Sequence, residues 1–377
     1  MSPGATRAWR RVHTWTSLVC TLFLLMLCIT GLAMIWLPEI DAHYADHPPV
    51  PTPPAGAPRL ADLDRVFRDA ETRAPGEKIT YADWAFTGDL LGVNLAKPGA
   101  PRARRQLVYD AHTGVFLEDL HGRKRGHPVR LFLGVMNKLH IQMFAGLPGE
   151  FFLAAMTSVF LVALISGVVL YAPFSPKAGF GEVRTERGAR IRWLDLHNLL
   201  GVATAGWVLV VAATGVMNAF TVPAYAAWRK GVLPELVKPY YGEAARRMLV
   251  GATAATAAAE GATPGARMVR ITTPGARDGT PGHWVVWTQG DRPVTKKLFR
   301  PVLVDAETGA AVVSHGPPWW LSTLQLSRPL HFGDYGGAPL KVLWTLFDLV
   351  AIVVLGSGLY LWVARLGRSR RMESHVG

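Results

Sequence analysis

Residues 192–217 read RWLDLHNLLGVATAGWVLVVAATGVM, a segment that is uncharged beyond its first four residues and long enough to cross a lipid bilayer. His197 lies near its start, and Gly215 follows eighteen positions later. The N-terminal segment RVHTWTSLVCTLFLLMLCITGLAM, residues 11–34, has the same arrangement, again with eighteen positions between a histidine and a glycine. These segments indicate that one structural unit occurs twice in the chain.

The composition of the chain is typical of a membrane protein. Of its 377 residues, 50% are hydrophobic, and they gather in long blocks. A helix needs about 20 apolar residues to cross the hydrocarbon core. Asp348 is the only charged side chain within the four blocks that reach this length, which are residues 14–37, 151–174, 196–220 and 342–364. We therefore expect four transmembrane helices.

Basic residues gather in three short segments: before the first block, between the second and third, and after the fourth. Short segments rich in Arg and Lys remain on the cytoplasmic side of a membrane. We therefore expect a multi-pass protein of the bacterial inner membrane with its N- and C-termini in the cytoplasm. The formal net charge of +13 follows largely from this topology, so it does not indicate a nucleic-acid partner.

Membrane helices are expected to alternate with longer exported domains. The predicted segments are a cytoplasmic N-terminus with the first membrane helix (1–37), a periplasmic domain (38–150), the second membrane helix (151–174), a cytoplasmic loop (175–192), the third membrane helix (193–221), a second periplasmic domain (222–341), the fourth membrane helix (342–364) and a cytoplasmic tail (365–377).

Each periplasmic domain is predicted to have an α+β fold. A helix-favouring run, residues 60–70 in the first domain and 243–260 in the second, precedes short strand-like segments. Both domains then contain the motif D-A-x-T-G, at residues 110–114 and 305–309, which is typical of a hairpin turn. Residues 1 to about 190 and about 191 to 377 are therefore predicted to be an internal duplication of helix, domain and helix.

Four histidines lie at equivalent positions of the two halves. The topology places His13 and His197 at the cytoplasmic ends of their helices, and His140 and His331 near the periplasmic ends. Ionisable residues at membrane depth are usually functional, and imidazole is a common axial ligand of haem iron. We therefore predict two bis-histidine haems b, one held by His13 and His197 and the other by His140 and His331.

Glycines recur at the depth of each histidine pair. Eighteen residues of helix span about 27 Å, so Gly31 and Gly215 are expected beside the His140/His331 haem. Gly167 and Gly358, each twenty-seven positions after His140 or His331, are expected beside the His13/His197 haem. We expect these glycines to make room for the two porphyrins.

Two other interpretations of the histidines are less favoured than haem. A single histidine at a membrane interface is more often in contact with water or lipid headgroups. Zinc is also less favoured, because two imidazoles on each side leave a tetrahedral site short of ligands. The duplication of all four positions favours haem over both alternatives.

The whole chain resembles the PepSY-associated transmembrane family, with D-A-x-T-G marking each PepSY-like domain and Leu139-His140 and Leu330-His331 heading the even-numbered membrane helices. The similarity extends to inner-membrane ferric-siderophore reductases. This resemblance implies a di-haem oxidoreductase that passes electrons to ferric siderophore in the periplasm.

A bis-histidine haem has no open coordination position, so electrons are expected to leave through its edge and to move outward across the membrane. Reduction to Fe(II) weakens a hard-oxygen chelate and releases iron. The short cytoplasmic segments contain no dinucleotide-binding motif. A quinol, a reduced flavin or a partner reductase is therefore expected to supply the electrons.

Secondary candidates lie around His331 and in the fourth helix. Trp319, Trp320, Phe332 and Tyr335 could wall a substrate pocket, although aromatic belts at membrane interfaces explain them nearly as well. Asp348 could pair with a polar group, carry protons or contact a quinol, and a structural hydrogen bond explains it equally well.

Two rival functions remain open. The first is a membrane-anchored binding or regulatory module without redox activity. The second is a haem-free iron transporter. Four duplicated histidines argue against a simple anchor, and four spans without a polar site at mid-membrane argue against a transporter.

Overall fold

The computed structural model describes residues 1–44, 59–84, 89–100, 105–121, 127–171, 181–228, 238–240, 247–276, 280–292, 295, 298–313 and 318–373. The chain folds into two compact units. The helical unit comprises residues 1–37, 132–222 and 326–377, and the sheet unit comprises residues 38–131 and 223–325. Each unit thus combines segments from both halves of the chain, as an internal duplication predicts.

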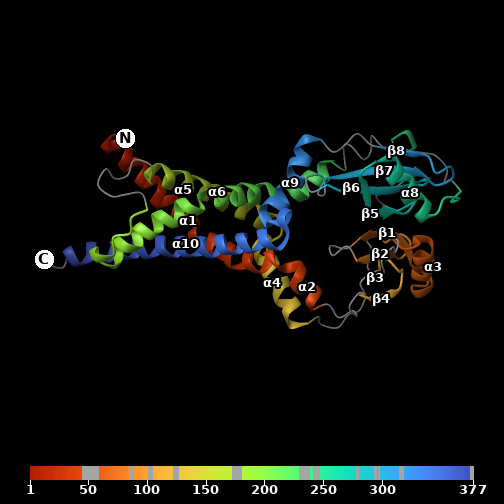
Figure 1. Cartoon of the computed structure of the whole chain (residues 1–377), viewed down its shortest axis with the longest axis horizontal. Helices are drawn as coiled ribbons and strands as arrows, with labels where there is room; N and C mark the ends of the chain where they lie inside the picture. The colour runs from red at the N-terminus through yellow and green to blue at the C-terminus, as the bar shows by residue number, and fades with distance from the viewer. Residues whose placement is uncertain are drawn as a thin grey trace. The chain divides into compact units, whose positions relative to one another are not determined.

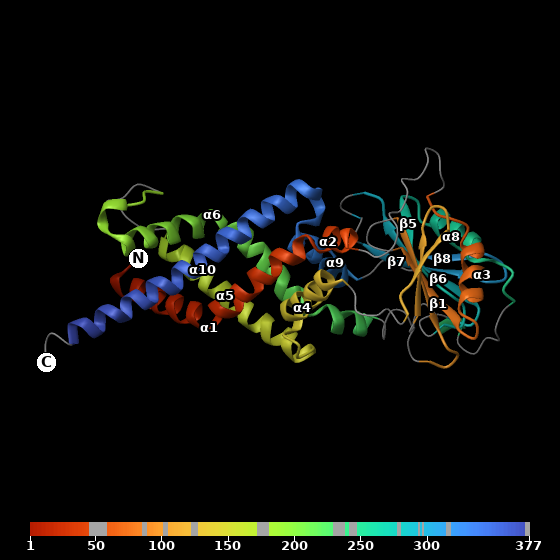
Figure 2. The same ribbon diagram turned by 90° about the horizontal axis from the view of Figure 1, so that it is seen from below.

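Four long helices build the helical unit: α1 (Pro3–Ile35), α5 (Leu147–Tyr171), α6 (Ala189–Asn218) and α10 (Gly337–Glu373). They lie side by side, and α1 packs against α5, α5 against α6, α6 against α10, and α10 against α1 (Figures 1 and 2). Each contains an apolar stretch long enough to cross a membrane. The prediction of four membrane helices in a bundle is therefore confirmed, with residues 172–174 of the second predicted helix outside the described residues.

Local signals explain where these helices begin. The Ser2 hydroxyl oxygen accepts a hydrogen bond from the Ala5 amide at 3.2 Å, which satisfies one of the free N–H groups of α1. Near the start of α6, Arg184 donates two hydrogen bonds to the Asp195 carboxylate, at 3.0 and 2.7 Å. This pair anchors the first turns of α6 to the described part of the predicted 175–192 loop, whose residues 175–180 lie outside the described residues.

Two shorter helices, α4 (Pro128–Gln142) and α9 (Trp319–Phe332), precede α5 and α10. The chain turns sharply after each of them. Met143 and Phe144 have φ angles of 47° and 59°, and Gly333 has a φ of 73°. His140 and His331 therefore lie on separate short helices that precede the membrane helices α5 and α10.

The sheet unit contains one antiparallel sheet in the strand order β4-β3-β2-β1-β5-β6-β7-β8. The first half of the chain contributes α2 (Leu37–His43), α3 (Leu63–Arg73), β1 (Lys78–Trp84), β2 (Leu90–Ala96), β3 (Arg105–Asp110) and β4 (Phe116–Asp119). The second half contributes α8 (Ala252–Ala262), β5 (Ala266–Thr272), β6 (His283–Gly290), β7 (Phe299–Asp305) and β8 (Ala311–Val313). Among the described residues, the short 3₁₀ turn η2 (Lys238–Tyr240) lies in the sheet unit, and η1 (Thr185–Arg187) and η3 (Asp334–Gly336) lie in the helical unit.

The two halves of the sheet join through β1 and β5. Ala82 pairs with Ile271, and the neighbouring residues on each strand continue the antiparallel register. Each strand would otherwise be an exposed edge with unpaired backbone groups. The two separate domains expected from the sequence therefore share one sheet, because each repeat satisfies the open edge of the other.

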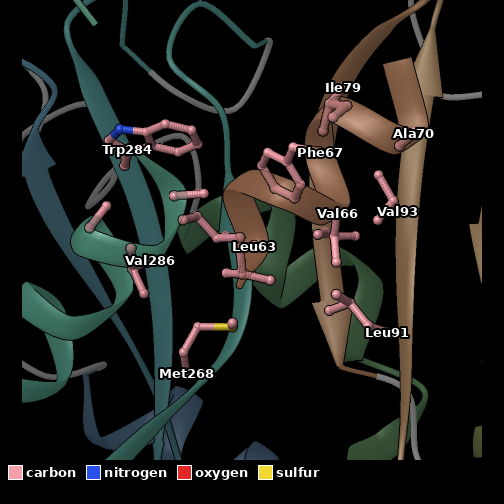
Figure 3. Packing of buried hydrophobic residues seen from close by; sticks show 14 of the residues in the cluster. Leu63, Val66, Phe67, Ala70, Ile79, Leu91, Val93, Met268, Trp284 and Val286 are labelled. Atoms are coloured by element: carbon pink, nitrogen blue, oxygen red, sulfur yellow. The ribbon is translucent and has the colours of Figure 1, made fainter. Parts of the chain in front are cut away.

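One face of the sheet carries the main hydrophobic core, which α3 and α8 cover. Figure 3 shows Leu63, Val66 and Phe67 of α3 facing Trp284 and the other labelled strand residues. Leu63 is fully buried, and Val66 and Trp284 are almost fully buried. The core thus contains side chains from both repeats, which explains why the sheet forms a single unit.

The helix of the second repeat is shorter than the sequence predicted. Within the predicted run 243–260, residues 243–246 lie outside the described residues, and α8 begins only at Ala252. Its first amide groups are bound from α3, because the Asp64 carboxylate accepts hydrogen bonds from the Ala252 and Thr253 amides at 2.7 and 3.3 Å. This tertiary cap places the start of α8 where helix propensity alone does not.

Both D-A-x-T-G motifs form the predicted hairpin turns, between β3 and β4 and between β7 and β8. The carboxylate of Asp110 accepts hydrogen bonds from the amides two and three residues later, and Asp305 does the same. Gly114 and Gly309 have φ angles of 69° and 76°, a backbone conformation that glycine adopts without a steric penalty.

Candidate functional site

The four predicted histidines form two pairs within the helical unit. His13 of α1 and His197 of α6 have ring centroids 6.4 Å apart, with their planes at 69°. His140 of α4 and His331 of α9 have ring centroids 6.3 Å apart, with their planes at 62°. We refer to these as the His13 pair and the His140 pair. The structure thus brings together the residues that the topology had paired.

The two pairs lie at different levels of the bundle. Helix α1 contributes His13 to one pair, and its Gly31 lies against the ring of His140 in the other. Helix α6 likewise contributes His197 to one pair and places Gly215 against the ring of His331. Eighteen helical residues separate the two levels on each helix, which corresponds to about 27 Å.

In the His13 pair, each imidazole bonds to a backbone carbonyl of a neighbouring helix. The Nδ1 atom of His13 lies 2.9 Å from the Ala163 carbonyl oxygen of α5. The Nδ1 atom of His197 lies 3.0 Å from the Val354 carbonyl oxygen of α10. A carbonyl oxygen only accepts hydrogen bonds, so Nδ1 must carry the proton in both rings.

The His140 pair follows the same rule on the other two helices. The Nδ1 atom of His331 lies 2.9 Å from the Val211 carbonyl oxygen of α6. The Nδ1 atom of His140 lies 2.8 Å from the hydroxyl oxygen of Thr30 on α1. Both imidazole rings are therefore oriented by hydrogen bonds at Nδ1.

This hydrogen bonding prepares the four rings for metal binding. When Nδ1 of a neutral imidazole is the donor, Nε2 has a free lone pair. Metal-binding histidines in proteins usually donate their second nitrogen to a carbonyl or carboxylate, which fixes both the tautomer and the ring orientation. Among the described residues, no hydrogen-bond partner occupies Nε2 in any of the four rings. All four Nε2 atoms are thus free to bind a metal ion.

The glycines have a more direct role than the sequence had indicated. A β-carbon at Gly167 would lie 3.0 Å from Cε1 of His13, and one at Gly215 would lie 3.1 Å from Cε1 of His331. The corresponding distance is 3.4 Å for Gly358 beside His197 and for Gly31 beside His140. Each glycine therefore lets an imidazole approach the backbone of a neighbouring helix. That the same glycines make room for a porphyrin stays a prediction.

Four hydroxyl residues belong to the site and were missed from the sequence. Each precedes one of the four glycines, and its oxygen lies within 3.3 Å of a histidine Nδ1. They are Thr30, Ser166, Thr214 and Ser357. Each hydroxyl donates to a carbonyl of its own helix, so its oxygen can accept from the imidazole N–H. The repeated Ser-Gly or Thr-Gly dipeptide was the signal that could have identified them.

The spacing of the two rings in each pair fits one metal ion between them. An imidazole nitrogen binds a metal ion at about 2 Å. The nitrogen lies roughly 1 Å from its ring centre, so two imidazoles on opposite sides of one ion have ring centres about 6 Å apart. The centroid distances of 6.4 and 6.3 Å agree with this arrangement.

The ligand count distinguishes haem from a bare metal ion. Among the described residues, no group of three or more His, Cys, Asp or Glu side chains is placed to hold a metal. Two imidazoles alone leave a tetrahedral zinc site incomplete. They complete the coordination of an iron that already has four porphyrin nitrogens, so the residues present fit a haem at each pair.

The predicted aromatic pocket is not assembled around His331. The ring of Phe332 lies 5.3 Å from the ring of His331, edge to face. Trp319 and Trp320 lie at the opposite end of α9, and Trp319 is 79% exposed. Tyr335 follows α9 in η3. The proximity of these residues in the sequence was misleading, because α9 separates the two tryptophans from His331.

Taken together, these features define an internally duplicated membrane protein, in which a four-helix bundle carries two pairs of half-buried histidines. The family described as the PepSY-associated TM region matches residues 10–365. The chain belongs to this family. A similar relative is an uncharacterized protein of Pseudomonas aeruginosa (strain PAO1), 25% identical over 252 residues. The match covers 62% of this chain and 64% of that protein, which is less than two thirds of the relative's length.

Proposed function

We propose that this protein is a di-haem b oxidoreductase of the bacterial inner membrane that passes electrons from the cytoplasmic side to ferric siderophore in the periplasm. The observation that carries this proposal is the presence of two imidazole pairs with ring centroids 6.4 and 6.3 Å apart. Each bound haem would supply a one-electron carrier at its own level of the membrane.

The residues of the bundle have three tasks in this function. His13 and His197 would hold one haem iron, and His140 and His331 would hold the other. The backbone carbonyls behind these rings keep Nδ1 protonated and direct Nε2 to the metal. Two histidines would complete the coordination of each haem iron, so the protein would reduce its substrate without binding it to that iron.

The direction of transfer rests on the basic residues. Arg7, Arg10 and Arg11 lie in the first turns of α1, before its apolar stretch, and further arginines lie before α6 and after residue 364. This distribution supports a cytoplasmic location for these segments and a periplasmic location for the sheet unit. The His13 pair would then lie on the cytoplasmic side and the His140 pair on the periplasmic side.

The substrate rests on the resemblance to ferric-siderophore reductases. One electron reduces one ferric ion to Fe(II), which binds hard oxygen ligands less strongly, so the chelate releases its iron. A quinol, a reduced flavin or a partner reductase would supply the electron. The described cytoplasmic-side segments contain no dinucleotide-binding motif that would assign this role to the chain.

Haem content tests the proposal directly. The full-length protein, purified from haem-replete cells, is expected to contain about two haems b per chain by pyridine haemochrome, with a Soret band that sharpens on reduction with dithionite. A colourless, folded preparation would contradict the proposal and favour the regulatory-module alternative.

The substrate requires its own measurement. Dithionite-reduced protein mixed anaerobically with a ferric hydroxamate or ferric catecholate siderophore is expected to reoxidise, and Fe(II) is expected to appear in a ferrozine assay. If the reduced haems persist with every ferric chelate tested, the protein is not a siderophore reductase even if it binds two haems.

A further inference from the structure

Asp348 is the only acidic residue within the four apolar blocks, and its surroundings are unusual. It lies on α10 and is 5% exposed. Its Oδ2 atom is buried and has no hydrogen-bond partner among the described residues. An ionised carboxylate so placed is costly unless a positive charge lies nearby.

The carboxyl group lies beside the His140 pair. A β-carbon added to Gly31 would lie 3.4 Å from Cε1 of His140 and 3.8 Å from Oδ2 of Asp348. One turn earlier on α10, the indole of Trp344 lies 3.0 Å from the β-carbon position of Gly333, close to His331 in the chain. The Asp348 carboxylate and the His140 ring therefore both lie against Gly31 of α1.

Beside the His13 pair the acidic residue is already paired, because Asp195, two residues before His197, accepts hydrogen bonds from Arg184 at 3.0 and 2.7 Å. The duplication does not supply a second carboxylate to the His140 pair either: Ser166 and Ser357 are equivalent in the two repeats, so the position equivalent to Asp348, nine residues before Ser357, is Thr157. Thr157 is buried, and its hydroxyl donates to the Leu153 carbonyl of its own helix at 2.8 Å. One repeat thus has a neutral, satisfied side chain where the other has an acid.

This difference has a predictable electrostatic effect. A porphyrin dianion with ferric iron and two neutral imidazoles has a net charge of about +1, which becomes about zero on reduction to ferrous iron. A buried carboxylate near such a centre stabilises the oxidised state, and its effect is strong because the surroundings have a low dielectric constant. The charge of the oxidised centre, in turn, offsets the cost of burying the carboxylate.

We propose that Asp348 is the counter-charge of the haem held by the His140 pair and lowers the reduction potential of that haem alone. This inference rests on the proposed function, because it requires that both pairs hold haem. Its consequence is that the haem nearer the substrate is a stronger reductant than it would be without this carboxylate. The duplicated bundle therefore contains two chemically different centres despite identical ligands.

The test is a spectroelectrochemical titration of the full-length protein and of Asp348→Asn, which removes the charge and keeps the size. At the potential where the wild-type haem of the His140 pair is half reduced, the ratio of reduced to oxidised haem is expected to rise at least tenfold in the variant. The haem of the His13 pair is expected to be unchanged. The two components are assigned by their loss in His140→Ala and in His13→Ala.

Two further variants separate charge from packing. Asp348→Glu keeps the charge and is expected to remain close to wild type. Asp348→Thr introduces the residue of the first repeat and is expected to shift the same haem in the same direction as Asp348→Asn. Both variants remove the charge, so either one is sufficient for the test if the other folds poorly.

Three outcomes would overturn the inference while leaving the proposed function intact: two bound haems with unchanged potentials, an equal shift in both haems, or a fall in the potential. A folded protein without haem would instead overturn the proposed function and this inference together.

Discussion

The His13 pair and the His140 pair contain the same chemical groups in different frameworks. His13 and His197 lie on long helices that continue through the bundle, whereas His140 and His331 lie on the shorter helices α4 and α9, each followed by a sharp turn. In both pairs the imidazole bonds a carbonyl and a neighbouring hydroxyl and lies against a glycine.

This comparison shows that a short local pattern can orient a metal-binding histidine in different settings. The carbonyl, the hydroxyl three residues later and the following glycine lie on one helical face, so the pattern needs only one turn of helix. The helix that carries the histidine can therefore change. What distinguishes the two pairs lies outside this pattern, above all in Asp348 beside the His140 pair.

Removal of a ligand should produce the largest effect and would test whether the pairs are independent. His13→Ala and His197→Ala are each expected to remove the same single haem, because an iron that loses one axial imidazole is held less strongly. His140→Ala and His331→Ala should remove the other haem. Pyridine haemochrome and the reduced spectra measure this loss. If His13→Ala and His197→Ala remove different haems, the pairing is incorrect.

Small substitutions at the glycines should have a graded effect. Gly167→Ala and Gly215→Ala place a β-carbon 3.0 and 3.1 Å from an imidazole, so the ring must move. Each is expected to reduce the occupancy of its own contacted pair severalfold.

The matched controls are Gly358→Ala and Gly31→Ala, where the distance is 3.4 Å and a smaller shift suffices. Haem occupancy of each pair is measured by spectral decomposition. The comparison between the pairs would fail if Gly215→Ala disturbed the haem of the His13 pair more than that of the His140 pair.

Substitution of the hydroxyl residues should weaken haem binding less than substitution of the glycines. Thr30→Val and Ser357→Ala remove oxygens 2.8 and 2.9 Å from Nδ1, and each is expected to speed haem loss about tenfold, as is typical when a group that orients a metal ligand is removed.

Thr214→Val and Ser166→Ala remove oxygens at 3.3 Å and are expected to have a smaller effect, because the carbonyl bond remains. Transfer of haem to an excess of a haem-scavenging apoprotein measures these rates. Equal rates in all four variants would show that the hydroxyls do not orient the rings.

A change in the sheet unit should have the smallest effect on either pair. Asp64→Ala removes the cap of α8 and is expected to cost about 1 kcal/mol of local stability. Hydrogen exchange at the first amides of α8 should then accelerate about fivefold, with haem content unchanged. Asp64→Asn keeps an oxygen acceptor and should exchange like wild type. Loss of haem in Asp64→Ala would show that the two units depend on each other.

Much of the helical unit could be predicted because apolar length and spacing are local properties. The four membrane helices follow from runs of uncharged residues, and the pairing of His13 with His197 follows from topology alone. The turn chemistry of Asp110 and Asp305 was equally readable, since an aspartate bonds amides only two and three residues away.

The remaining features depend on contacts between distant residues. The contact of Gly167 with His13 was not predicted, because the spacing within a helix does not specify which atoms of another helix fill the space beside a glycine. The pairing of β1 with β5 was missed because strands of both repeats have similar patterns, and nothing in either pattern specifies its partner. The start of α8 at Ala252 likewise depends on Asp64 of another helix.

The sequence by itself determined that this is a duplicated membrane protein with four helices and four equivalent histidines, because hydropathy and periodicity act over neighbouring residues. Only the tertiary structure decided that the two repeats share one sheet, that the glycines receive imidazole rings, and that a single carboxylate lies beside one pair. Such choices depend on which surfaces meet when the two repeats pack together, and that packing also makes two chemically equivalent histidine pairs unequal.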